Sequence, residues 1–274
     1  MRLLFLGDVM GRAGREMVYD ELPKLRAKYK LDFVIVNGEN SAAGFGMTEE
    51  IALDLFDAGA DVITMGDHCW DKKEALIFIE KYDNLVRPLN FTAGTPGRGT
   101  GMYAAKNGAM VLVIHALGRV FMPPRDCPFM AIEQQVELSP LGQVADVIFV
   151  DFHAEATSEK MAMGQFLDGR VSAMVGTHTH VPTGDAHIMA GGTAYMTDAG
   201  MCGDYNSVIG SEPEEPLNRF LHGRRMGSFT PAVGAVTLSG ICVDIDDKTG
   251  LANHCSALRL GGVLQPQSPD FWPA

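Results

Sequence analysis

The sequence predicts an α/β fold built around a parallel β-sheet. Three short apolar runs, at residues 3–6, 33–36 and 62–65, have the length of buried strands. Each run is followed by a stretch with apolar residues at helical spacing. Strands that alternate with helices form parallel sheets, because the crossover connections place the helices on the faces of the sheet. Two further apolar runs, at 147–150 and 171–175, continue the pattern.

The remaining elements follow one another without a repeat or a linker. Helices are expected at 15–29, from about Thr48 onward, at 72–81, at 129–138, from a Ser158 cap to 167, and at 217–222. Antiparallel pairs are expected at 102–105 with 111–115, at 187–189 with 193–196, and at 235–243 with 256–260. Residues 198–210 are rich in glycine and predict a loop. The simplest organisation is one domain spanning residues 1–274.

Composition and charge exclude several classes of protein. The formal net charge of −12 disfavours binding of bulk nucleic acid, which needs a basic surface. A small anionic substrate stays compatible with this charge, because a bound metal creates its own positive field. The five cysteines contain no CxxC pair, which favours a reducing cytoplasm over disulfides or a thiolate zinc site. The apolar runs are too short for a signal peptide or a membrane helix, so we expect a cytoplasmic protein without a membrane partner.

Polar side chains that bind metals follow five of the predicted strands. They are Asp8, then Glu39 with Asn40, Asp67 with His68, His153, and His178 with His180. Ligands of α/β sheets bind beyond the carboxyl ends of the strands, so these side chains are expected at one edge. The set is too large for one cation, and oxygen and nitrogen donors without thiolate suit Mn²⁺, Fe or Zn²⁺. The pattern predicts two divalent metals that activate a water and clamp a phosphoryl group.

Other interpretations of these motifs are weaker. Asp8 could cap a helix, and His68 could be an ordinary loop histidine, but the five strand ends together would then be a repeated accident. Glycines at 7, 11 and 14 do not match the dinucleotide fingerprint. Cys69 beside His68 could be a nucleophile, but no strand-to-helix elbow or third triad member supports it. The histidines at 115, 187, 222 and 254 lack the context of the cluster and are expected in the core or on the surface.

Several motifs together resemble a known family. The runs GDVMGR, NGENSAAGFG, GDHCWD, DFHAEATSEK and GTHTHVPT resemble the YmdB-type branch of the calcineurin-like metallophosphoesterases. The resemblance extends over nearly the whole chain and includes TAYMTDAGMCGDYNSVIG. It implies a four-layer αββα sandwich and a homodimer or homotetramer. Some members hydrolyse 2′,3′-cyclic nucleotides, so the implied activity is that of a phosphodiesterase acting on small cyclic nucleotides.

The resemblance also implies roles for single residues. One metal would be held by Asp8, Glu39, Asn40 and His180, and the second by Glu39, Asp67, His153 and His178. Glu39 would bridge the two ions, and His68 would donate a proton to the leaving group. We also expect the basic side chains of Arg12 and Arg119 near the substrate phosphate.

One position departs from the family pattern. The third strand end reads Gly-Asn-His in the family and Gly66-Asp67-His68 here. Asp67 still offers an oxygen ligand, but its charge lowers the Lewis acidity of a neighbouring metal and faces the approaching phosphate. Two hypotheses follow: a phosphodiesterase, or a metal- and nucleotide-binding regulator with weak or no turnover because of Asp67.

Overall fold

The predicted apolar runs form the central strands of two β-sheets. The structure, a computed structural model, describes residues 1–272. The order in the first sheet is β2 (Asp8–Val9), β12 (Met201–Asp204), β13 (Val236–Ile245), β1 (Arg2–Leu6), β3 (Phe33–Asn37), β4 (Val62–Thr64) and β5 (Leu85–Val86), with β14 (Ala252–Gly261) also paired to β13. The order in the second is β10 (His187–Ile188), β11 (Ala194–Met196), β9 (Ala173–Thr177), β8 (Val147–His153), β7 (Met110–Leu117) and β6 (Thr100–Ala104). Strands β1, β3 and β4 run parallel, as do β7, β8 and β9.

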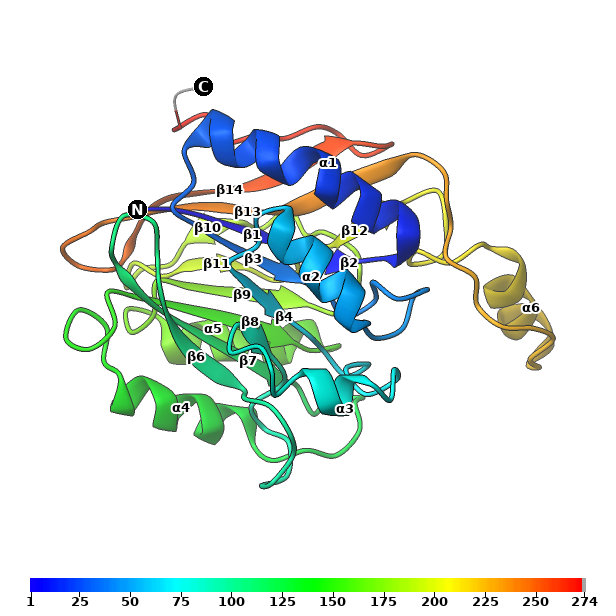
Figure 1. Cartoon of the computed structure of the whole chain (residues 1–274), viewed down its shortest axis with the longest axis horizontal. Helices are drawn as coiled ribbons and strands as arrows, with labels where there is room; N and C mark the ends of the chain where they lie inside the picture. The colour runs from blue at the N-terminus through cyan, green and yellow to red at the C-terminus, as the bar shows by residue number, and fades with distance from the viewer. Residues whose placement is uncertain (273–274) are drawn as a thin grey trace.

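Helices cover the outer face of each sheet. α1 (Gly11–Tyr29) and α2 (Glu49–Asp57) lie on the first sheet, and α4 (Pro128–Leu138) and α5 (Thr157–Leu167) lie on the second (Figure 1). The remaining helices are α3 (Ala75–Phe78) and α6 (Glu214–His222). The α/β class and the four-layer αββα sandwich are therefore confirmed.

The side chains of β1 show why its run is continuously apolar. Leu4 and Leu6 enter the core under α1 and α2, whereas Leu3 and Phe5 enter the core between the two sheets. Phe5 meets Phe149 of β8 with ring centroids 5.0 Å apart. A strand that is buried on both faces has no polar side, and this is the signal that the sequence carries.

Some elements differ from the prediction. The helix expected at 72–81 shrinks to α3, and the helix expected from a Ser158 cap begins at Thr157 without a side-chain cap. The loop at 198–210 contains β12, which pairs in parallel with β2, and neither short strand has an apolar run that could announce it. α1 begins at Gly11 rather than at residue 15. A Cβ on Gly14 would lie 2.2 Å from the Cys202 carbonyl oxygen, so close packing of α1 on β12 requires glycine there.

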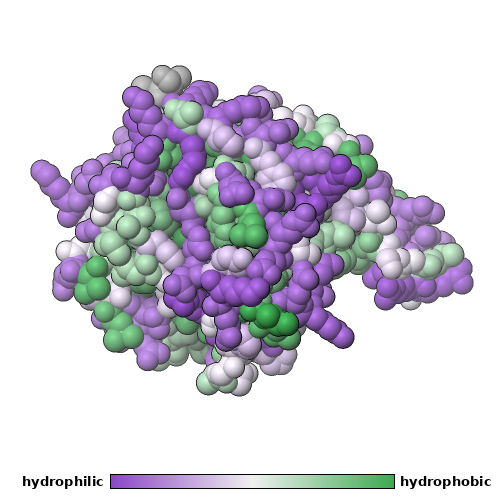
Figure 2. Space-filling model, viewed as in Figure 1, coloured by the Kyte–Doolittle hydropathy of each residue, from purple (hydrophilic) through white to green (hydrophobic). Residues whose placement is uncertain are grey.

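Two features of the architecture position the site. The carboxyl ends of β1, β3, β4, β8 and β9 come together at one edge of the sandwich, beside a protrusion that we call the arm, residues 211–231. The arm carries α6 away from the sheets, and it shows apolar residues among hydrophilic ones (Figures 1 and 2). Within residues 1–272, no helix combines the length and the apolar character needed to span a membrane.

Candidate metal centre

The structure brings carboxylates and imidazoles from separate strand ends into one cluster. Three sets of side chains have ligand atoms within 4.8 Å of one another: Asp67, His153 and His178; Asp8, Glu39 and His153; and Glu39, Asp67 and His68. Asp8 begins β2, His153 ends β8, and the others follow β3, β4 and β9. The edge predicted from the strand exits is therefore where these side chains gather.

His153 lies at the centre of the cluster with too many partners for its protons. Its Nε2 is 2.6 Å from Glu39 Oε2, 3.1 Å from Asp67 Oδ1 and 3.0 Å from His178 Nδ1. One N–H can serve only one of them well. Glu39 Oε2 meets Nε2 at ion-pair distance, yet it has no hydrogen bond, so the distance is right and the direction is not. Asp8 Oδ1 is likewise buried without a hydrogen bond.

The other nitrogen of His153, Nδ1, is oriented by hydrogen bonds through Thr177 to Asp151. His153 Nδ1 lies 2.9 Å from Thr177 Oγ1, and that hydroxyl donates to Asp151 Oδ1 at 2.6 Å. Since the hydroxyl proton goes to Asp151, Nδ1–H must be the donor to Thr177. Nε2 therefore presents its lone pair to the cluster whenever the ring is neutral.

Asp151 is a fully buried carboxylate with a complete set of donors. Thr64 and Asn37 donate to Oδ2 at 2.6 and 3.0 Å, and His115 Nδ1 lies 3.3 Å from the same oxygen. Burial raises its pKa, but His115, the charge of His153 and the hydrogen bond from Thr177 outweigh burial and lower the pKa of Asp151 below its ordinary value. Asn37 also accepts the Glu39 N–H at 3.1 Å, so this network supports the cluster from two sides.

At a second place, two acceptor atoms face each other: His180 Nε2 and Asn40 Oδ1. His180 Nδ1 donates to the Ile209 carbonyl at 2.7 Å, which leaves Nε2 as the acceptor nitrogen. Asn40 Nδ2 donates to the Gly44 carbonyl at 3.0 Å, which turns Oδ1 toward His180. The two acceptors lie 3.1 Å apart. Burial lowers the pKa of His180, which favours the neutral imidazole that metals bind.

The pKa shifts of the cluster also favour a bound cation. Burial raises the pKa of Asp8 well above its ordinary value, and Glu39 and Asp198 raise it further, although His153 opposes them. Burial disfavours the His153 imidazolium, but Glu39, Asp67 and Asp8 outweigh burial and raise the pKa of His153. A cation among these carboxylates would take the place of that proton.

The absence of a side chain at Gly66 leaves room for such a cation. A Cβ on Gly66 would lie 2.0 Å from Glu39 Oε2 and 2.6 Å from His153 Nε2, so any side chain there would fill the cluster. Orphaned buried oxygens, opposed lone pairs and this glycine together fit divalent metals bound by oxygen and nitrogen.

The chain is similar to known proteins over nearly its whole length. The family model described as YmdB-like protein matches residues 4–258. The chain belongs to the YmdB-like family. It is 51% identical over 249 residues to the 2′,3′-cyclic-nucleotide 2′-phosphodiesterase of Bacillus subtilis, covering 91% of this chain and 93% of that protein. It is 37% identical to a putative phosphatase/phosphodiesterase of Mycoplasma genitalium, covering 95% of this chain and 93% of the relative.

Solved structures of the same type match the whole fold. A hypothetical protein from Thermus thermophilus superimposes with a TM-score of 0.89 at 41% identity, covering 96% of this chain and all of that one. A phosphatase from Mycoplasma pneumoniae superimposes with a TM-score of 0.88 at 36% identity, covering 95% and 93%. With these relatives, this YmdB-like chain is a hydrolase of the phosphodiesterase type with a candidate metal-binding cluster.

The His-x-His segment of this family member is not extended. His178 and His180 have φ values of +100° and +65°, so the chain turns sharply at both residues. As a result His178 faces His153, and His180 faces Asn40. The turn is held by Asp198, which accepts from the Thr179 N–H at 3.1 Å and from its hydroxyl at 2.7 Å.

A buried ion pair supports this turn. Lys160 Nζ lies 2.6 Å from Asp198 Oδ2, and both side chains are almost fully buried. Gly176, which precedes the motif, packs against the same group, since a Cβ there would lie 1.9 Å from the Thr197 carbonyl oxygen and 2.8 Å from Lys160 Cδ. Sequence reasoning missed Lys160 and Asp198, although both lie inside the quoted family motifs.

Asp67 and His68 occupy the third strand end in different ways. Burial raises the pKa of Asp67, but hydrogen bonds from His153 and His178 outweigh it and lower the pKa far below its ordinary value. His68 donates its backbone N–H to Glu39 Oε1 at 3.0 Å. Its Nδ1 lies 2.9 Å from Asp71 Oδ2, so Asp71, which the sequence analysis did not single out, orients the imidazole.

The expected arginines and the cysteine lie apart from this arrangement. Arg12 is 79% exposed on α1 and pairs with Glu16, and Arg119 is exposed and has its backbone N–H held by Glu159. Neither lines the cavity above the candidate metal ligands. Cys69 is buried, and burial raises the pKa of its thiol, which disfavours a nucleophilic role.

A cavity of about 580 Å³ opens over the cluster. Glu39, Asn40, His68, His178 and His180 lie at its polar end. Its other walls come from the body and from the arm and are mostly apolar: Met10, Phe45, Val208, Ile209, Pro216, Arg219, Phe220 and Phe229. The sequence did not predict that the arm lines this cavity, because no motif within residues 211–231 indicates it.

Replacing Thr177 with valine tests the support of His153. The change keeps the shape but leaves His153 Nδ1 and Asp151 Oδ1 without their shared partner. We expect Mn²⁺ affinity, measured by calorimetry on chelator-treated protein, to fall by roughly 10–100-fold. Thr177→Ser keeps the hydroxyl and serves as the control. Equal Mn²⁺ affinity in the valine variant and the wild type would show that Thr177 does not support the ligand.

Proposed function

We propose that this protein is a dinuclear, metal-dependent phosphodiesterase that hydrolyses small phosphodiesters, with 2′,3′-cyclic nucleotides as the first candidates. The observation that carries the proposal is that nitrogen and oxygen atoms face each other without enough protons for hydrogen bonds, both around His153 and between His180 and Asn40. The name of the Bacillus subtilis relative supports the substrate class. A cytoplasmic location and a homo-oligomeric state belong to the same proposal.

The proposed ligands form two sets, one around His153 and one around the His180–Asn40 pair. Asp8, Glu39, Asn40 and His180 would hold one ion, and Glu39, Asp67, His153 and His178 would hold the other. Divalent metals supply Lewis acidity and an activated water to such a reaction. Fe or Mn²⁺ suits this donor set best, and Zn²⁺ is an alternative.

His68 is the proposed proton donor. Its Nδ1–H is directed to Asp71, which leaves Nε2 on the side of the cluster, 4.0 Å from Asp67 Oδ2. When water adds to phosphorus and the bond to one ribose oxygen breaks, the protonated imidazole gives its Nε2 proton to that oxygen, and the attacking water releases one proton to the solvent. The product is a phosphomonoester, and the ring is left neutral.

Asp67 favours a second candidate function. Its carboxylate adds negative charge where the family has a neutral amide, which would slow attack on an anionic phosphate. A regulator that binds metal and nucleotide with little turnover is therefore the alternative.

Metal analysis and a panel of phosphodiesters on wild type and Asp67→Asn separate the two. We expect two metals per chain in both proteins. Loss of the extra charge should speed hydrolysis by Asp67→Asn about tenfold, which corresponds to about 1.4 kcal/mol in the barrier. Undetectable hydrolysis by both proteins with Mn²⁺ or Fe²⁺ present, together with tight nucleotide binding, would favour the regulator.

A further inference from the structure

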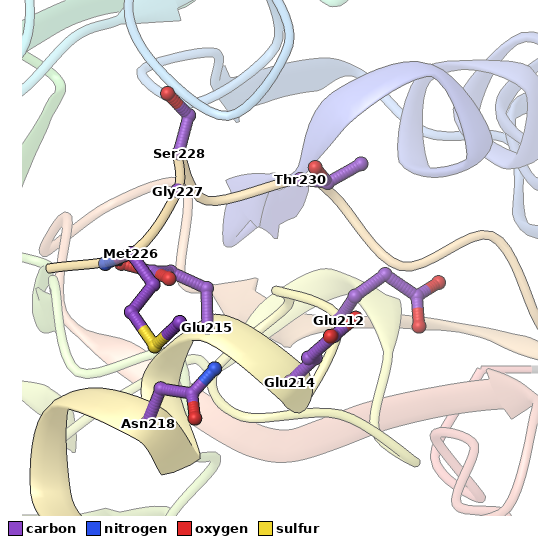
Figure 3. A pocket seen from close by; sticks show the side chains of 8 residues that line it. All are labelled: Glu212, Glu214, Glu215, Asn218, Met226, Gly227, Ser228 and Thr230. Carbon is purple, nitrogen blue, oxygen red and sulfur yellow. The ribbon is translucent and has the colours of Figure 1, made fainter. Parts of the chain in front are cut away.

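The arm has a rigid internal structure. At its base, Glu212 N–H donates to the Thr230 carbonyl at 2.8 Å, and the Ser211 and Val208 backbones bond to each other. Glu215 is almost fully buried and rises from α6 toward Met226, whose N–H it accepts at 3.2 Å (Figure 3). These bonds fix the returning segment 226–230 against α6, so the side chains that the arm presents to the cavity have defined places.

Arg219 is held in this structure by three contacts. Its Nε donates to Glu215 Oε1 at 2.8 Å, its Nη2 lies 3.4 Å from the Gly227 carbonyl, and its guanidinium lies 3.9 Å from the centre of the Phe229 ring. Its charge is already paired, so it is poorly suited to binding a phosphate. A guanidinium that is fixed over an aromatic ring instead extends a flat, delocalised surface.

Phe220 follows Arg219 on α6 and also lines the cavity, although its side chain is 84% exposed. Phe45, Val208 and Ile209 add apolar side chains to the lining of the same cavity, and Ile209 also accepts the hydrogen bond from His180. One continuous cavity thus has donor atoms for metals and phosphate at one end and an exposed aromatic ring at the other.

We propose that the arm forms a stacking site for the planar base of a nucleotide whose phosphate lies at the metal ligands. The proposal rests on the proposed function and adds the location and the residues of base recognition: Phe220 as the platform, with Arg219 and Phe229 as its fixed neighbour. Stacking accepts any base, because every base has a π-face. The site therefore selects nucleotides over base-free phosphodiesters rather than one base over another.

Two substrates with the same reacting group test this selectivity. They are 2′,3′-cyclic AMP and methyl ribofuranoside 2,3-cyclic phosphate, which lacks a base. We expect the ratio of kcat/KM for the nucleotide to that for the base-free diester to fall about tenfold in Phe220→Ala and in Phe229→Ala. Leu221→Ala is the matched control, because Leu221 is 72% exposed on the same helix and does not line the cavity. Its ratio should equal that of the wild type.

A binding experiment separates this proposal from the catalytic one. Anisotropy of 1,N⁶-ethenoadenosine, measured with chelator present, needs neither metal nor turnover. Weaker binding by Phe220→Ala than by Leu221→Ala supports the base site even if neither cyclic phosphate is hydrolysed, in which case the proposed function fails alone. Unchanged ratios and unchanged binding overturn the base site. A change only in sedimentation of Phe220→Ala overturns it too, since the ring would then cover a second copy of the chain.

Discussion

Hydrolysis of a dialkyl or cyclic phosphodiester by His68→Ala is expected to fall by about 10²–10⁴-fold, because the leaving alkoxide then departs without a proton. The imidazole that is lost is positioned by Asp71 at 2.9 Å and lines the cavity beside Glu39. The backbone N–H of residue 68 still reaches Glu39 in the alanine variant, so this proposed metal ligand keeps that bond. Initial rates at saturating Mn²⁺, with metal content measured in parallel, check the result.

The leaving group identifies the role of the ring. Bis(p-nitrophenyl) phosphate releases nitrophenolate, which needs no proton, so His68→Ala should lose much less activity on it. His187→Ala is the control, since His187 is exposed and does not line the cavity. Full activity of His68→Ala on the poor leaving group would eliminate the proton-donor role, and an equal loss on both substrates would indicate damage to metal binding instead.

Replacing Lys160 with methionine should cause the largest loss of stability. The change leaves Asp198 as a buried carboxylate without its cation, which costs about 3–5 kcal/mol of unfolding free energy. For a chain of this size, the unfolding temperature should fall on the order of 10 °C. Because Asp198 also holds Thr179, metal affinity should fall with it. Thermal unfolding by circular dichroism, with and without Mn²⁺, measures both effects.

A surface lysine provides the comparison. Lys24 pairs with Glu21 on α1 but is 67% exposed, so Lys24→Met should leave the unfolding temperature nearly unchanged. The double variant Lys160→Met with Asp198→Asn should recover part of the loss, because no unpaired charge is then buried. If Lys160→Met and Lys24→Met unfold at the same temperature, the buried pair does not stabilise the turn at His178.

The candidate site was predictable to the extent that it follows strand ends. Asp8, Glu39, Asp67, His153 and His178 each come within three residues of the end of a continuous apolar run, and the carboxyl ends of parallel strands meet at one edge. Both signals are local, so they can be read along the chain. Asp151 had a signal of the same kind, since it lies two residues before His153 and interrupts an apolar strand with a charge.

The partners of these residues were not predictable in the same way. Thr177 of β9 supports His153 of β8 only because those strands are neighbours, and Lys160 of α5 meets Asp198 only because α5 packs on the same sheet. Arg12 shows the converse, since its place in a family motif did not bring it to the cavity.

The buried strands, their parallel order and the donor atoms at their ends can be read from the amino-acid residues alone, because burial on both faces and metal chemistry each demand particular residue types at particular places. The pairing of β2 with β12, the turn at His178 and His180, and the approach of the arm to the cavity emerge only in the folded chain. Those features depend on contacts between segments far apart in the chain. Packing and buried hydrogen bonds determine such contacts, so no local pattern of residues predicts them.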